Sequence, residues 1–129
     1  MPKQFTALEV FKIAKSNIQE RNTSRDFDYD WKTMLNIGLS NLFEVNNEYR
    51  LSLNKKPLTE IPYISNNDDV IPYEHQIVLE LLVIYLCREF MKDEDLNKYS
   101  LFDTQFLNNY QRLVRLGDTA SSSSDDTAE

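Results

Sequence analysis

The sequence predicts an all-α protein: a small four-helix domain with a long connection between the second and third helices, which could include a short extended segment, and a disordered acidic C-terminal tail. Only two glycines and four prolines occur in 129 residues, too few for the turns of an all-β protein. Residues 72–92 are apolar on nearly every side, as in a buried helix or a membrane span. Because a span needs about 20 mostly apolar residues and Glu80 interrupts this run, we expect the central helix of a domain.

The first helix is expected from about Ala7 to Arg21. Thr6 and Glu9 form a T-x-x-E capping box, in which each side chain bonds the backbone N–H of the other residue. Apolar residues then recur at the spacing of one helix face, at Leu8, Phe11, Ala14 and Ile18.

The second helix is expected to begin near Asp28 or Asp30, which are candidate caps. It should reach Tyr49 and could extend to Asn54. Gly38 falls inside the helix, where glycine costs about 1 kcal/mol relative to alanine. Two interpretations stay open: another backbone approaches closely at Gly38, or the glycine is tolerated without a role. The apolar stripe consists of Trp31, Leu35, Leu39, Leu42 and Tyr49.

The connection over residues 55–71 contains prolines, asparagines and aspartates, which interrupt helices. An apolar stretch, Ile61-Pro62-Tyr63-Ile64, lies in its middle. Long ordered connections are often functional. The stretch is therefore either a short strand or loop that pairs with a neighbouring subunit, or a segment that covers the core of its own domain.

The third helix is expected to begin with Pro72 in its first turn and to end near Lys92. The fourth should begin near Ser100, where Ser100 and Asp103 resemble a second capping box. Gly117 is placed to end that helix in the left-handed conformation.

Residues 118–129 differ from the body, residues 1–117, because they contain no large apolar side chain. They cannot bury enough surface to offset the entropy of ordering, so we expect a flexible, Ser-rich tail that could order on a partner. The chain carries a net charge of −7, and the tail supplies four of its acidic residues, Asp118, Asp125, Asp126 and Glu129. This balance argues against nucleic-acid binding, which needs clustered Lys and Arg.

The residues indicate no catalytic site, metal site or cofactor. His75 is the only histidine, and with Glu74 and Glu80 it lacks the spacing of a metal motif. Cys87 is the only cysteine and lies inside the apolar run, where a thiol is usually inert. A single cysteine and an N-terminus without a secretory pattern favour synthesis in a cytoplasm, and nothing indicates a membrane.

Three features in order resemble the head-to-tail adaptor, or connector, proteins of tailed bacteriophages. The first is an aromatic, acidic helix entry followed by a helix with an internal glycine. The second is a proline-containing connection before a strongly apolar helix. The third is an acidic break followed by aromatic residues at helical spacing. The matching segments are Phe27-Asp-Tyr-Asp-Trp31, Leu35-Asn-Ile-Gly-Leu39, Asp69-Val-Ile-Pro-Tyr-Glu74, Tyr85-Leu-Cys-Arg-Glu89, Phe102-Asp-Thr-Gln-Phe106 and Tyr110-Gln-Arg-Leu113.

This resemblance implies a non-enzymatic virion protein at the head–tail junction, made in the cytoplasm of the bacterial host. Such proteins form a ring, commonly of twelve copies, between the portal protein and the tail or nozzle proteins. DNA passes through the ring without specific binding. In several members the C-terminal segment inserts against the portal. Here the tail has only Ala120 and Ala128 as apolar anchors, which departs from that pattern.

The partner-interface candidates are the apolar stretch of the connection and the acidic tail, that is Ile61, Pro62, Tyr63, Ile64, Asp118, Asp125 and Asp126. Two rival functions remain. One is a small acidic regulatory protein that binds and inhibits a host protein. The other is an enzyme with a dispersed site built on His75, Glu74 and Glu80.

Overall fold

The computed structural model of the protein describes residues 4–18 and 31–128, with side chains described as far as residue 115. Within these residues the chain is all-α and no strand occurs, which confirms the predicted fold class. The helices are α1 (Ala7–Ile18), α2 (Trp31–Asn41), α3 (Phe43–Ser52), α4 (His75–Ile77), α5 (Val83–Met91) and α6 (Leu96–Ala128), with a π-helical turn, η1 (Val78–Leu82), between α4 and α5.

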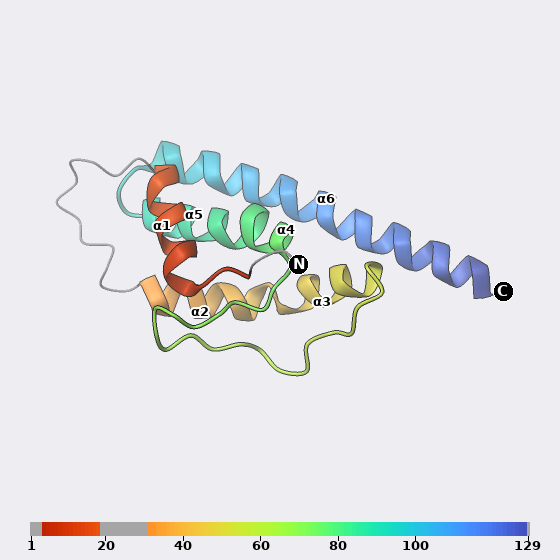
Figure 1. Ribbon diagram of the computed structural model, residues 1–129. Coiled ribbons are helices and arrows are strands. Elements are labelled where there is room, and N and C mark those ends of the chain that lie inside the picture. The colour runs from red at the N-terminus through yellow and green to blue at the C-terminus, as the bar shows by residue number, and fades with distance from the viewer. Residues whose placement is uncertain (1–3, 19–30, 129) are drawn as a thin grey trace.

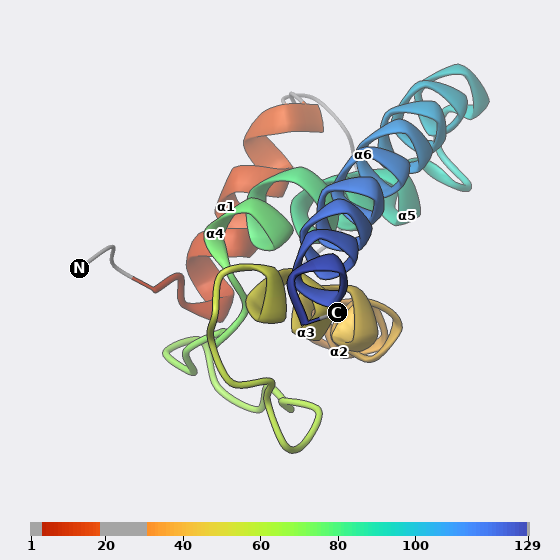
Figure 2. The same cartoon turned by 90° about the vertical axis from the view of Figure 1, so that its right-hand side faces the viewer.

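The described residues form four continuous helical rods, because one pair of elements and one set of three join end to end. The segments α4, η1 and α5 follow one another without a break and form the central helix. Only Leu42 separates α2 from α3, and the backbone bonds from Leu42 to Gly38 and from Asn46 to Leu42, both 3.0 Å, continue the helical ladder across it. Figures 1 and 2 show the central helix between α6 and the α2–α3 rod, with α1 crossing at one end.

The central helix is buried on most sides, as its composition predicts. Ile77, Val78, Leu81, Leu82 and Leu86 have no exposed surface. Each such side chain contributes about 1.5–3 kcal/mol when it leaves water. The predicted start is wrong: Pro72 lies outside the helix, which begins at His75 after an extended Glu74.

The first helix confirms its capping box. The Thr6 backbone N–H donates to Glu9 Oε1 at 2.9 Å, and the Glu9 N–H donates to Thr6 Oγ1 at 3.3 Å. Farther along α1, the Phe11 ring stacks on Trp31 at 4.5 Å and meets Phe90 edge-on at 5.9 Å. These rings join α1, α2 and α5. The predicted helix end at Arg21 and the candidate caps Asp28 and Asp30 lie outside the described residues.

The last helix differs from its prediction at both ends. It begins at Leu96 rather than near Ser100, because Asp95 Oδ1 accepts the Lys98 N–H at 3.1 Å and caps the first turn. At the other end α6 continues through Gly117, which has no positive φ. No proline follows Gly117 to block the helical backbone, and one glycine costs only about 1 kcal/mol. The segment beyond it projects away from the packed body (Figure 1).

The connection between α3 and α4 contains no strand in the structure. Its one extended pairing is an isolated antiparallel bridge between Thr6 and Val70 of the same chain. Backbone bonds flank the bridge: Ala7 N–H donates to Asp69 O at 2.8 Å and Ile71 N–H donates to Phe5 O at 2.8 Å. The later part of the connection therefore pairs with the start of its own chain.

Candidate interaction surface

Two asparagine side chains hold the connection against the α2–α3 rod. Asn36 on α2 donates from Nδ2 to Ile64 O at 3.0 Å and accepts the Ile64 N–H at 2.7 Å. Asn47 on α3 makes the same pair of bonds with Leu58, at 3.1 Å and 2.8 Å. A carboxamide presents a donor and an acceptor side by side, as a peptide group does. Each asparagine side chain therefore makes, with one residue of the connection, the two backbone hydrogen bonds that a neighbouring strand would otherwise make.

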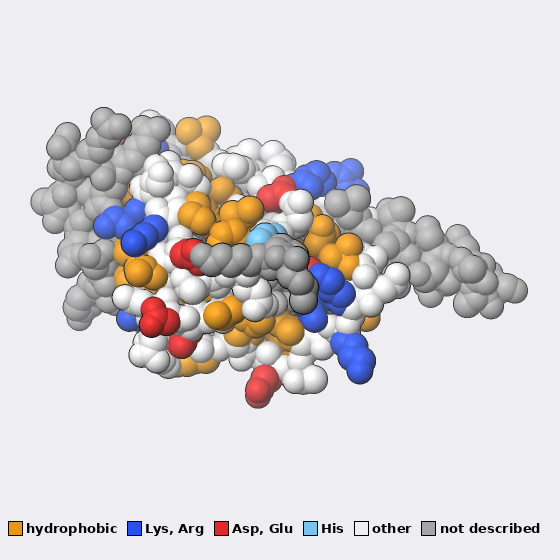
Figure 3. Space-filling view, in the orientation of Figure 1, with side chains coloured by type: hydrophobic (Ala, Val, Ile, Leu, Met, Phe, Trp, Pro, Cys, Tyr) orange, Lys and Arg blue, Asp and Glu red, His pale blue; other side chains and the backbone are white. Residues whose placement is uncertain are grey.

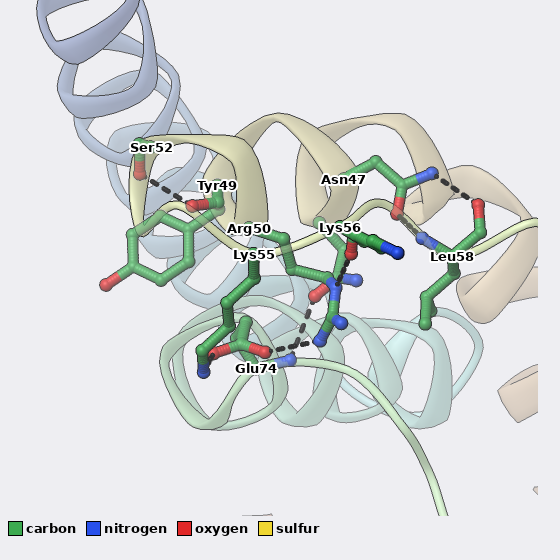
Figure 4. Close-up of polar contacts among 9 residues, drawn as sticks. Asn47, Tyr49, Arg50, Ser52, Lys55, Lys56, Leu58 and Glu74 are labelled. Carbon is green, nitrogen blue, oxygen red and sulfur yellow. Dashed lines mark hydrogen bonds and ion pairs between the residues drawn. The ribbon is translucent and has the colours of Figure 1, made fainter.

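An ion-pair cluster fixes the junction between the connection and the central helix (Figure 4). Glu74 accepts from Arg50 Nη1 and from Lys55 Nζ, both at 2.8 Å. Arg50 also donates through Nε to Lys56 O at 2.7 Å. The Glu74 N–H donates to Oδ1 of the buried Asn46 at 2.9 Å, while Asn46 Nδ2 has no hydrogen-bond partner among the described residues.

A tight turn closes the far end of the apolar stretch. Asp69 Oδ2 accepts the Ser65 N–H at 2.8 Å and the Asn66 N–H at 2.9 Å. The backbone N–H groups of Asn66 and Ser65 lower the pKa of the Asp69 carboxyl below its usual value, because they stabilise the ionised form.

Between these anchors lies a groove of about 430 Å³ beside α2, lined by Thr33, Asn36, Ile37, Ser40, Ile61, Pro62 and Tyr63. We call this groove and its lining the connection surface. Ile37, Ile61 and Tyr63 are 50%, 47% and 75% exposed. In Figure 3, hydrophobic side chains lie among scattered charges on the lower part of this face, along which the connection runs in Figure 1. Apolar side chains on a backbone held at both ends form a preorganised contact site.

The structure separates the sequence-predicted interface residues into two groups. Ile61, Pro62 and Tyr63 line the connection surface together, whereas Ile64 is 2% exposed and belongs to the core. The stretch therefore covers its own core through Ile64 and presents Ile61 and Tyr63 outward. Its pairing with a neighbouring subunit stays a prediction. The side chains of Asp118, Asp125 and Asp126 lie outside the described part of the chain.

The residues of the dispersed-site hypothesis have separate partners. Glu74 binds Arg50 and Lys55, and Glu80 pairs with Arg112. The His75 ring lies 4.7 Å from that of Phe5. Among the described residues, no three His, Cys, Asp or Glu side chains gather as metal ligands would.

The buried thiol of Cys87 lies against α1. It donates to Ala14 O at 3.5 Å, and burial raises its pKa to about 12. The thiolate is the reactive form, so this side chain is unreactive near neutral pH.

Sequence reasoning missed Asn36, Asn47 and Ile37. One signal was available: Asn36 and Asn47 are eleven residues apart, which places them on the same face of a continuous helix. Their backbone partners could not be identified, because the path of the connection is a tertiary feature.

No helix within residues 4–18 and 31–128 combines the length and apolar character of a membrane span. Comparison of the chain with protein-family models, with curated proteins and with solved structures finds no match.

Proposed function

We propose that this chain is a head-to-tail adaptor of a tailed bacteriophage, a virion structural protein that forms a ring between the portal and the tail and extends the DNA channel. The proposal combines the adaptor resemblance with one structural observation. Ile61 and Tyr63 stand exposed on a backbone that Asn36 and Asn47 fix in place.

The connection surface suits a contact between subunits. Side chains already held in their bound arrangement lose little entropy when a partner packs on them. A ring requires that one face of a subunit meets a different face of the next. In the proposed ring, the connection surface is one of these two faces.

The mechanism is surface complementarity and involves no catalytic step. The portal and the tail or nozzle proteins are the expected partners, and twelve copies is the ring size that the resemblance implies. The acidic balance of the chain, −7 overall, favours a channel lining that does not retain DNA, since both carry negative charge.

The test is affinity purification of the protein from its native source, followed by mass spectrometry of the proteins that co-purify and of their copy ratio. We expect recovery inside particles, together with a portal-sized protein at about equal copies. Recovery with a host enzyme at a one-to-one ratio, and absence from particles, would overturn the proposal and favour the inhibitory function instead.

A further inference from the structure

We propose that the acidic C-terminal segment, residues 118–129, docks on a basic surface at the corresponding end of a second copy of this chain. This inference rests on the proposed ring function, to which it adds a specific contact between subunits. The basic surface consists of Arg50, Lys55, Lys56, Arg112 and Arg115.

The basic surface exposes mainly positive groups to solvent, because the carboxylates of Glu74 and Glu80 are less exposed than the Lys and Arg side chains that pair with them. Glu74 is 13% exposed, whereas Lys55, one of its two partners, is 50% exposed. Glu80 is 27% exposed and its partner Arg112 is 45% exposed. Both ion pairs therefore show more of their positive group to solvent. Lys56 and Arg115 are exposed as well and add to the positive charge.

The cations belong to one end of the molecule. Glu74 immediately precedes the central helix, and Glu80 lies six residues later in the π-helical turn η1 of the same helix. Arg50 reaches Glu74 from α3 and Arg112 reaches Glu80 from α6, and α3 packs directly on α6. In Figure 3 basic side chains lie at both ends of this face, and one group of them is on the side toward which α6 runs in Figure 1.

The end of α6 has the opposite charge. Residues 118–129 contain Asp118, Asp125, Asp126 and Glu129 and no Lys or Arg. Asp125 follows Arg115 by ten residues, which places it about 15 Å farther along the helix axis. Figures 1 and 2 show this part of α6 pointing away from the body of its own chain. Because the backbone of α6 runs away from the body of its own chain as far as Ala128, its acidic end is better placed to meet a second molecule than its own basic surface.

A second copy of the chain is a suitable partner, because every copy carries both an acidic end and a basic surface. These are two different surfaces of one molecule, so the acidic end of one copy can bind the basic surface of the next. Contacts between unlike surfaces are heterologous, and they close into a ring when the rotation between copies permits. Exposed charges attract over about 10 Å at 0.1 M salt, so the contact should weaken as salt is added.

The test mixes equal amounts of ¹⁴N- and ¹⁵N-labelled full-length protein at millimolar concentration and treats the mixture with a water-soluble carbodiimide. This reagent joins carboxylates to lysines that already touch them. We expect peptides from residues 118–129 joined to Lys55 or Lys56 with mixed isotopes, at a yield that falls as NaCl is raised. Cross-links with one isotope only, or no cross-link to either lysine, would overturn the inference.

A charge-reversal series gives an independent measurement of the same contact. Lys56→Glu with Arg115→Glu should weaken self-association about tenfold by sedimentation equilibrium, because reversal turns the attraction between exposed charges into repulsion. The control is Lys12→Glu with Lys98→Glu, two exposed cations outside the basic surface. Adding Asp125→Lys and Asp126→Lys to the first pair should restore the affinity.

Equal weakening by the control pair, or no recovery with the added lysines, would refute the contact. The outcome is separable from that of the proposed function. A protein that cross-links tail to body between copies but is absent from phage particles would retain this contact and lose the adaptor function. A protein present in particles whose tail cross-links only to a different protein would retain the function and lose this contact.

Discussion

Gly38 lies against the ring of Tyr85, at the point where α2 packs on the central helix. A Cβ at this position would lie 2.9 Å from Tyr85 Cδ1 and 3.0 Å from Leu82 Cδ1. The Tyr85 ring cannot move away easily, because Arg88 lies over its face with Cζ 5.1 Å from the centroid and Phe106 packs beside it at 6.3 Å. Of the two interpretations of Gly38, close approach by another backbone is therefore wrong, because the atoms nearest this position belong to side chains of the central helix.

Gly38→Ala should lower the free energy of unfolding by about 1 kcal/mol. The helix-propensity gain of about 1 kcal/mol is outweighed by an overpacking cost of about 1–3 kcal/mol. Ser40→Ala is the matched control, since Ser40 is exposed on the same helix and the change should stabilise by a few tenths of a kcal/mol. Urea unfolding measures both, and stabilisation by Gly38→Ala would show that Tyr85 and Leu82 can shift.

Cys87 links stability to alkaline pH. Burial raises its pKa from 9.0 to about 12, so the folded protein keeps the thiol proton while the unfolded chain releases it. Stability from this group is complete below pH 9 and is lost as pH rises toward 12. Burial also raises the pKa of Tyr73 and Tyr85, which adds the same trend above pH 10.

We expect the wild type to lose about 1 kcal/mol more stability than Cys87→Ala between pH 8 and pH 10. Urea unfolding of both proteins at the two pH values isolates the cysteine, because the tyrosines are common to both. An equal loss in the two proteins would mean that Cys87 ionises normally in the folded state.

The connection is the element whose position depends on side chains of another element. Ile64 is 2% exposed, and both of its backbone polar groups bond Asn36. Without that carboxamide they would be buried without partners, which costs about 1–3 kcal/mol for each group. The connection therefore has a fixed path although it has no regular secondary structure.

Asn36→Ala should destabilise the protein by about 2 kcal/mol and speed hydrogen exchange of the Ile64 amide more than that of the Leu58 amide, which Asn47 still holds. Asn108→Ala, at an exposed position on α6, is the control and should change neither amide. Protection of the Ile64 amide that survives Asn36→Ala would show that another contact holds the connection.

At the scale of the whole molecule, the proposed ring depends on exposed residues of the connection surface. Ile61→Asp with Tyr63→Asp places two charges on this surface, and a desolvated charge without a partner opposes association. The monomer should remain helical, because the two side chains are 47% and 75% exposed.

We expect the double variant to abolish ring assembly on the portal, observed by electron microscopy, with an unchanged circular dichroism spectrum. Leu96→Asp with Leu107→Asp is the control, since these residues are 73% and 49% exposed and lie on α6, away from the connection surface. If the Ile61 and Tyr63 variant forms normal rings, the connection surface is not part of the interface between subunits. An equal assembly defect in the control variant would also contradict the prediction.

The periodic features of the fold follow from the sequence. Apolar residues at helical spacing predicted the rods, and Thr6 with Glu9 predicted the start of α1, because both patterns act over one or two helical turns. Ser100 and Asp103 gave a wrong start for α6 for the same reason, because they fit the local pattern of a capping box. In the structure Asp103 accepts a hydrogen bond from Arg88 Nη1 at 3.0 Å instead of capping a helix.

The sequence by itself determined the all-α class, the buried central helix and the contrast between a mildly acidic body and an acidic end, since these depend on composition and short-range periodicity. Only the tertiary structure decided that Ile61 and Tyr63 face outward while Ile64 is buried, and that cations from α3 and α6 meet at one end. Those features depend on contacts between residues such as Asn36 and Ile64, 28 positions apart, whose pairing no local pattern specifies.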